Sequence, residues 1–174
     1  MIAARFTPLT CPSCGRDLVG READCLAFCP DCSGCWRCDR DGLSDIPVRT
    51  VLVDGAPSSA SLPLPCWRRG NVVQPAFLSA RPLWLARAIS ELAATWRFVP
   101  GLAAPPPLGA CIPPESIEVA SRLARLLPPA PHDRLELIVV PCSRLGRRWH
   151  LPGSSPGGLY PDDVLEARWL ERRG

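Results

Sequence analysis

The sequence contains no lysine, and all 20 of its basic residues are arginine. The absence of lysine excludes mechanisms that need a phosphate-loop lysine or a Schiff-base lysine. Histidine is almost as scarce, because His132 and His150 are the 2 examples in 174 residues, and neither lies in a nucleophile–base motif. The motifs of serine hydrolases, zinc proteases and dinucleotide-binding proteins are missing as well. We therefore expect a protein that is not an enzyme.

Long hydrophobic runs are also missing. No apolar run approaches the roughly 20 residues that a membrane-spanning helix requires, and the first residues lack the apolar core of a signal peptide. The chain is 47% apolar and 21% charged, which is typical of globular proteins and unlike disordered ones. We expect a cytoplasmic protein with no membrane span, built as one modest domain or as one domain with a small module.

Cysteine, in contrast, is abundant, and seven of the ten cysteines fall between residues 11 and 38. Four of them form two Cys-Pro-x-Cys pairs, Cys11 with Cys14 and Cys29 with Cys32. A Cys-x-x-Cys turn brings both thiolates to one cation, and two such turns complete a tetrahedral shell. We therefore predict a structural Zn²⁺ site with Cys11, Cys14, Cys29 and Cys32 as ligands. Mononuclear iron is chemically compatible with the same four ligands.

Three further cysteines in this segment, Cys25, Cys35 and Cys38, leave alternatives open. Cys35 and Cys38 continue the three-residue spacing of the second pair, which resembles the cysteine run of iron–sulfur proteins. The ferredoxin pattern favours a cysteine–proline pair after such a run, whereas Asp39 follows Cys38. A [4Fe–4S] cluster, a second zinc ion and plain additional thiols are the three interpretations.

The composition changes near Ser44, and we divide the chain into a zinc ribbon of residues 1–45 and an α+β domain of residues 46–174. The first part holds five arginines against seven acidic residues, and the second holds fifteen against ten. In the second part, apolar runs between prolines predict strands, and apolar residues at helical spacing predict helices. The predicted strands are Ile46–Val53, Cys66–Trp67, Asn71–Phe77, Leu135–Val140 and Arg148–Leu151, the predicted helices are Pro82–Phe98, Glu115–Leu127 and Asp162–Arg172, and Ser58–Pro65 and Pro100–Pro114 are predicted to be connecting segments.

A weak internal repeat links two parts of the α+β domain. The segment Leu64–Gly70 is echoed by Val140–Gly146, and each is followed by a short strand, a loop and a helix that begins after proline. The echo indicates two related strand–turn–strand–helix units, with chance matching in an arginine- and proline-rich chain as the alternative. The cysteines of this domain, Cys66, Cys111 and Cys142, are expected to be small buried side chains.

The order of these motifs resembles a group of uncharacterised bacterial zinc-ribbon proteins. The resemblance is carried by Cys11–Gly15, Cys29–Trp36, Leu64–Arg68 and Val72–Phe77, and the later segments Leu137–Pro141 and Tyr160–Pro161 fit the same layout. It implies a ribbon followed by an α+β body, and it implies no activity. The chain departs from the group by carrying cysteine at positions 66 and 142, where an aromatic residue is expected, and by its three additional thiols around the ribbon.

Three functions fit these residues. We favour a non-enzymatic accessory or scaffold protein that binds another protein within a larger bacterial assembly, because Trp36 and Trp67 predict apolar edges for a partner. A nucleic-acid-binding accessory factor is the alternative, because the chain contains three arginine pairs, although the ribbon itself is net acidic. These pairs are Arg68-Arg69, Arg147-Arg148 and Arg172-Arg173. An iron–sulfur or iron redox protein is the third hypothesis.

Overall fold

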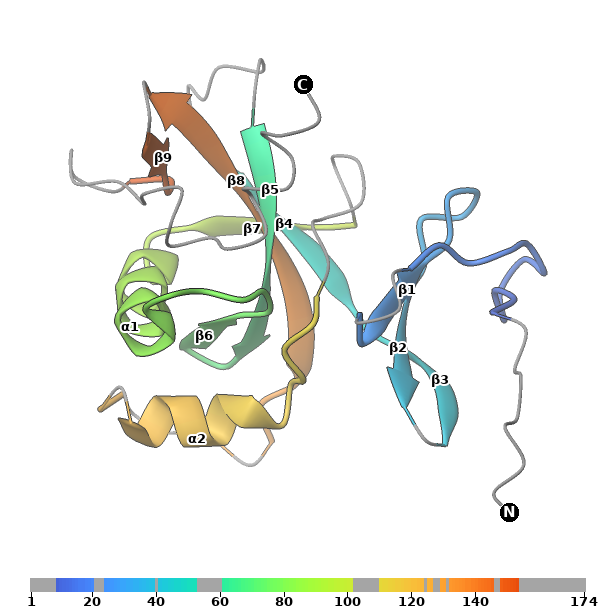
Figure 1. Ribbon diagram of the computed structural model, residues 1–174, viewed down its shortest axis with the longest axis horizontal. Coiled ribbons are helices and arrows are strands. Elements are labelled where there is room, and N and C mark those ends of the chain that lie inside the picture. Colours follow the sequence, from blue (N-terminus) through green and yellow to red (C-terminus); the bar gives the residue numbers. More distant parts are fainter. Residues whose placement is uncertain are drawn as a thin grey trace.

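The fold is mixed α+β, as predicted, with the cysteine cluster at its N-terminal end (Figure 1). The computed structural model describes residues 9–20, 24–39, 41–52, 61–101, 110–123, 125–126, 129–130, 132–145 and 148–153. Within these residues the chain forms two sheets and two helices. The predicted final helix Asp162–Arg172 lies outside the described residues, and none of the described helices is long and apolar enough to cross a membrane.

The first sheet holds the two Cys-Pro-x-Cys turns in place. It consists of three antiparallel strands in the order β1 (Leu26–Phe28), β2 (Cys35–Asp39) and β3 (Gly42–Asp45). Val19 forms a bridge with Phe28, so the segment that carries the first cysteine pair is bonded to β1. The second pair lies in the connection between β1 and β2, and both pairs are therefore anchored to one small sheet.

The second sheet has six strands, and the long strand β8 (Leu135–Leu145) runs through its centre (Figure 1). Its main path follows the order β6-β5-β8-β4-β7, and β9 pairs with the far end of β8. The strand β4 pairs with β8 in parallel, whereas the other pairs are antiparallel. The remaining bounds are β4 (Val48–Leu52), β5 (Ser61–Arg69), β6 (Val72–Pro75), β7 (Arg97–Pro100) and β9 (Arg148–His150).

The strand β5 begins earlier than the sequence suggests, and the prediction of a loop over Ser58–Pro65 is wrong from Ser61 onward. Pro63 pairs with Pro141, and since neither has a backbone N–H, this pair is of the non-hydrogen-bonded kind. The missing N–H groups therefore face away from the β5–β8 ladder. Pro141 also lies between the part of β8 that pairs with β4 and the part that pairs with β9. The absence of its backbone N–H therefore removes no hydrogen bond between these strands.

The helix α1 (Pro82–Ala93) is shorter than the predicted Pro82–Phe98. The backbone N–H and the hydroxyl of Thr95 both donate to the carbonyl of Leu92, at 2.9 Å and 2.8 Å, and close the last turn. The following residues form β7, which pairs with β4. The chain therefore leaves the helix at this point and adds a strand to the second sheet.

The helix α2 (Ser116–Leu123) confirms the core of the second predicted helix, Glu115–Leu127. Ile117 is 2% exposed and Ala120 is 9% exposed, in agreement with the predicted apolar stripe, but Leu123 is 62% exposed. Glu118 and Arg122 are four residues apart, a spacing that allows an ion pair along the helix, but Glu118 pairs with Arg69 of β5 at 2.9 Å. The tertiary ion pair thus replaces the local one.

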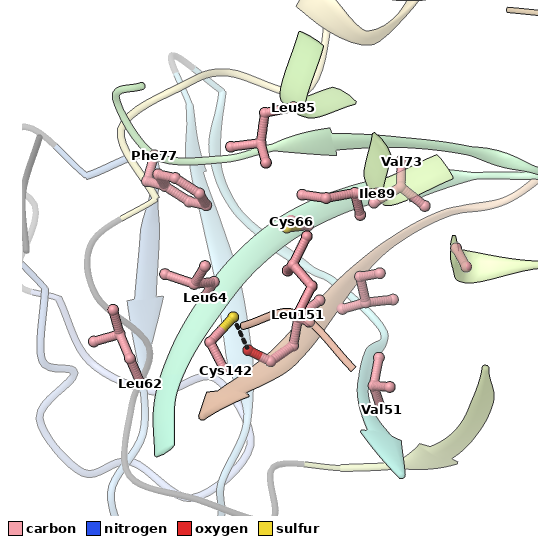
Figure 2. Packing of buried hydrophobic residues seen from close by; sticks show 13 residues of the cluster. Val51, Leu62, Leu64, Cys66, Val73, Phe77, Leu85, Ile89, Cys142 and Leu151 are labelled. Atoms are coloured by element: carbon pink, nitrogen blue, oxygen red, sulfur yellow. Dashed lines mark hydrogen bonds between the residues drawn. The ribbon is translucent and has the colours of Figure 1, made fainter. Parts of the chain in front are cut away.

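The second sheet is covered on both faces, because alternate residues of its strands enter two different hydrophobic clusters. On one face, Leu64, Val140 and Ile89 of α1 belong to the first cluster, and Cys66 and Cys142 are buried with them, as predicted (Figure 2). On the other face, the second cluster joins this sheet to α2 and to the first sheet, and it includes Leu26, Phe28, Cys35, Trp67, Ile117 and Leu137. The core is therefore continuous between the cysteine-rich part and the body.

Two sequence expectations about exposure are wrong. Trp36 is 9% exposed and Trp67 is 0% exposed, so neither forms an apolar edge for a partner. Trp67 is covered by the second cluster, and its Nε1 donates to the Ile112 carbonyl at 2.6 Å. Cys111 is half-buried rather than buried.

The two echoed segments lie side by side. Leu64 pairs directly with Val140, its counterpart in the repeat, so the β5–β6 and β8–β9 hairpins are related by an approximate two-fold axis at this pair. The helix that would complete the second unit lies outside the described residues. The break between the two sheets falls where the domain boundary was predicted, because β3 ends at Asp45 and β4 begins at Val48. Whether the two parts are separate domains stays a prediction.

Candidate metal centre

The two Cys-Pro-x-Cys turns have the same backbone geometry. The backbone N–H of Cys11 donates to the Arg16 carbonyl at 2.7 Å, and the N–H of Cys29 donates to the Gly34 carbonyl at 2.8 Å, which is the same five-residue closure. The residue after the second cysteine of each turn is left-handed, with φ of 72° at Gly15 and 57° at Ser33. This conformation reverses the chain and brings both thiols of a turn to the same side.

The four predicted ligands converge on one point. The sulfurs of Cys11, Cys14, Cys29 and Cys32 all lie within 4.8 Å of one another. Across the two turns, Sγ of Cys11 is 3.6 Å from Sγ of Cys32, and Sγ of Cys14 is 3.4 Å from Sγ of Cys29. Four thiolates at about 2.3 Å from one zinc ion would be about 3.8 Å apart. We call this group the cysteine tetrad, and its spacing fits one tetrahedral cation.

The thiols of the tetrad influence one another. Burial opposes ionisation of Cys11, but the backbone amides of Cys14 and Ser13 donate to its sulfur, and its pKa falls to about 6. The Arg16 amide favours the thiolate of Cys14, but crowding by the other thiols, Cys29 foremost, prevails and raises the pKa of Cys14 to about 12. A cation bound at this point would favour the thiolate form of all four cysteines.

The surroundings of the tetrad also fit a metal. Trp36 is buried, and its Nε1 has no hydrogen-bond partner among the described residues. A Cβ added at Gly34 would lie 3.1 Å from this Nε1 and 3.3 Å from Sγ of Cys32, so the indole N–H and the sulfur border the same small space. Thiolates bound to a metal accept hydrogen bonds from such donors. The unpaired indole N–H is therefore available to a charged Cys32 sulfur.

The three additional cysteines are not members of the tetrad. Cys35 is 2% exposed and belongs to the second cluster, whereas Cys38 packs in the cluster that contains Cys11 and Trp36. They occupy positions 35 and 38 of one strand, so their side chains leave opposite faces of the first sheet. Cys25 donates to the Ala110 carbonyl at 2.7 Å. Among the described residues, the tetrad is the one group of metal-ligating side chains of this kind.

Four of the described arginines of the body, Arg49, Arg68, Arg69 and Arg87, form ion pairs. Arg68 and Arg49 both pair with Glu136, at 2.7 Å and 2.6 Å, and Arg68 also stacks over the ring of Phe98. Arg69 pairs with Glu118 and donates to the Asp133 carbonyl. The side chains of the other two predicted arginine pairs lie outside the described residues.

The sequence predicts the four cysteines of the tetrad, because their spacing is local, but it does not predict Trp36 as a neighbour of the tetrad. The sequence holds one weak signal for this neighbour, because Trp36 lies only four residues after Cys32. Comparisons with protein-family models, with curated proteins and with solved structures gave no match. The function must therefore be inferred from the geometry and chemistry of the described residues.

Proposed function

We propose that this chain is a non-enzymatic accessory protein of a bacterial assembly, in which a zinc ion bound to the cysteine tetrad stabilises the fold and an apolar surface binds another protein. Relationship to the uncharacterised zinc-ribbon proteins named above is part of this proposal. All ten cysteines are free of disulfides, which supports a reducing cytoplasmic location.

The role of the metal follows from its place in the fold. Cys11 and Cys29 are 1% and 2% exposed, and Cys14 and Cys32 are exposed but paired with them across the two turns. A shell of four thiolates has no open position for a substrate, which is typical of structural zinc. The chemistry supplied by the bound ion would be the cross-linking of the two turns, not catalysis.

One observation carries the binding role. Eight large apolar side chains are more than a third exposed among the described residues, and four of them, Leu78, Leu83, Val119 and Leu123, line a single groove at α1 and α2. Singly scattered apolar residues are common on any surface, whereas apolar residues gathered in one groove mark interaction sites. This groove replaces the tryptophan edges that the sequence suggested.

Metal analysis tests the first half of the proposal. We expect one zinc ion per chain and a colourless protein after anaerobic purification. Cys29→Ser should lose the metal, because three thiolates bind zinc far more weakly than four, whereas the matched variant Cys38→Ser should retain it. Iron with visible absorbance would contradict the proposal, as would retention of zinc by Cys29→Ser.

Co-purification tests the second half. The tagged full chain, recovered from its native source, should carry a partner protein at a fixed ratio, and the same partner should be lost from Cys29→Ser if the metal supports the fold. Recovery of a partner-free monomer from every lysate would overturn the binding role. Recovery with nucleic acid that dissociates steeply as salt rises would instead favour the alternative function.

A further inference from the structure

The connection that leads into α2 is bonded to the cysteine-rich part of the chain. We call residues 110–116 the bridging segment, and they lie on the side of the body that faces the first sheet (Figure 1). The backbone N–H of Cys25, just before β1, donates to the Ala110 carbonyl at 2.8 Å, and the Cys25 thiol donates to the same carbonyl at 2.7 Å. Arg37 of β2 also pairs with Glu115. The bridging segment is therefore held from the side of the first sheet.

The body holds the same segment from its other side. Nε1 of Trp67 donates to the Ile112 carbonyl at 2.6 Å, and the Ile112 N–H donates to the Ala76 carbonyl at 2.9 Å. Nε2 of Gln74 donates to Oγ of Ser116 at 2.7 Å, at the start of α2. The bridging segment thus links the first sheet to β5, to β6 and to the helix that follows it.

The helix α2 depends on such contacts, because it is too short to be stable alone. It has 8 residues, and isolated helices shorter than about 12–15 residues are marginal in water. Its side chain Ile117 is 2% exposed and packs in the second cluster, to which β1 contributes Leu26 and Phe28. Loss of β1 would remove one side of this cluster and expose part of Ile117 to water.

The first sheet depends in turn on the tetrad. Its strands have only 3, 5 and 4 residues. The third hydrophobic cluster, which covers its other face, takes two of its five buried members from the tetrad, and it consists of Cys11, Leu18, Ala27, Cys29 and Trp36. No disulfide joins the two Cys-Pro-x-Cys turns. In a module of this size the free energy of metal binding is free energy of folding, so the first sheet would open when the metal is removed.

The opposite face of the body does not share this dependence. All described members of the first cluster lie between Val51 and Leu151 in the sequence, whereas the first sheet ends at Asp45. Leu85 and Ile89 of α1 are both 0% exposed in this cluster. Opening of the first sheet would therefore leave the packing of α1 on the second sheet unchanged.

We propose that metal binding at the tetrad controls the order of α2 through the bridging segment. With the metal bound, residues 110–123 are held against the second sheet, and on its removal they are released while α1 stays folded. The inference rests on the metal binding proposed above and names the element that responds to it. Release would uncover Trp67 and Leu137, which are 0% exposed in the second cluster, and would remove the α2 wall of the groove.

Hydrogen–deuterium exchange measured by mass spectrometry tests the proposal on the full reduced chain, first with zinc bound and then after its removal with EDTA. We expect exchange in residues 110–123 to become at least about tenfold faster without zinc, because local unfolding exposes these amides. Exchange in α1 (Pro82–Ala93) should change less than about twofold. Unchanged exchange in residues 110–123 would overturn the proposal, and so would equal acceleration in α1, which indicates global unfolding. A chain that binds no zinc would instead contradict the proposed function itself.

Cys25→Ala tests the bridging segment with the metal in place. Cys25 is not a member of the tetrad, so this variant should retain one zinc ion, but it loses the thiol hydrogen bond to the Ala110 carbonyl. We expect severalfold faster exchange in residues 110–123 than in the zinc-bound parent chain. The matched control is Cys38→Ala, because Cys38 packs against the third cluster on the other face of the first sheet.

Glu115→Gln gives a second test, because it removes the ion pair with Arg37 at a side chain that is 60% exposed, where the change does not disturb the core. It should accelerate exchange in residues 110–123 in the same direction as Cys25→Ala and should leave α1 unchanged. If both zinc-bound variants exchange like the parent chain, the bridging segment does not carry the coupling and the proposal fails.

Discussion

The indole of Trp36 lies in the same cluster as Cys11 and Cys29 of the tetrad. Its buried N–H has no partner among the described residues and borders the same space beside Gly34 as the Cys32 sulfur. We expect Trp36→Phe to lower zinc affinity about tenfold, since loss of an outer hydrogen bond to a metal ligand has effects of about 10- to 100-fold. Competition with a chromophoric chelator measures the change.

The control for this prediction is Trp96→Phe. Trp96 also loses a hydrogen bond when replaced, because its Nε1 donates to the Pro152 carbonyl at 2.9 Å, but it packs against the first cluster, away from the tetrad. Equal zinc affinities for Trp36→Phe and the parent chain would show that the indole N–H has no role at the metal.

For single residues, the sequence could predict the cysteine tetrad but not the burial of Trp67. The tetrad was predictable because Cys11 and Cys14, and likewise Cys29 and Cys32, are neighbours in the chain, and a short turn alone decides that each pair converges. The burial of Trp67 was not predictable, since α2 and β8, which cover it, lie about 45 to 70 residues further along the chain. Local chemistry is visible in a sequence, whereas burial is set by distant partners.

At the scale of secondary-structure elements, Ser90 protects the edge strand β6. Its hydroxyl accepts a hydrogen bond from the Val73 N–H at 2.9 Å and also contacts the Val73 and Ala86 carbonyls, at 3.1 Å and 2.7 Å. Val73 is fully buried, so Ser90→Ala leaves its N–H without water or partner. We expect a loss of about 1–3 kcal/mol in the free energy of unfolding, measured by urea denaturation.

Ser79→Ala provides the comparison for Ser90→Ala. The hydroxyl of Ser79 also accepts a backbone hydrogen bond, from Arg81 at 3.2 Å, but Arg81 is exposed and its N–H can bond to water after the change. The expected loss is below about 0.5 kcal/mol. Equal effects of the two substitutions would contradict the role assigned to Ser90.

The elements that sequence predicted correctly are those with a strong local pattern. The centre of α1, the core of α2 and the start of β8 follow from apolar periodicity. The first half of β5 could not be predicted, because Pro63 and Pro65 argue against a central strand unless the pairing leaves their nitrogens outside the ladder. That register is set by β8, some 70 residues away, and no local signal reports it.

At the scale of the whole molecule, the cysteine-rich part and the body share one core. Leu26 and Phe28 of β1 pack with Trp67 and Leu137 of the second sheet. Cys25 adds a backbone and a side-chain hydrogen bond to the Ala110 carbonyl, both near 2.8 Å. The change of composition near residue 45 thus marks a change of sheet rather than a gap in the core. A metal ion bound to the tetrad would therefore be linked to the folding of the body as well.

The buried thiols of the body make the stability of the whole molecule sensitive to alkaline pH. Cys66 and Cys142 are both 0% exposed, and burial raises their pKa well above the ordinary 9.0, with the Ala76 amide opposing the shift at Cys66 without offsetting it. Below pH 9 both states keep these protons, so the thiols add no pH dependence. Above pH 9 the unfolded chain releases protons that the folded chain retains, and the free energy of unfolding falls as pH rises.

The slope of this fall is the testable quantity. Each fully buried thiol contributes about 1.4 kcal/mol per pH unit above its unfolded pKa. Urea denaturation of the reduced protein at about pH 8 to 10.5 should therefore show a shallower decline for Cys66→Ala than for the parent chain. Ile89→Val removes a similar small volume from the same cluster without removing a titrating group, so its curve should lie below the parent curve and parallel to it. Parallel curves for Cys66→Ala and the parent would mean that Cys66 ionises as readily in the folded protein as in the unfolded chain, which its complete burial argues against.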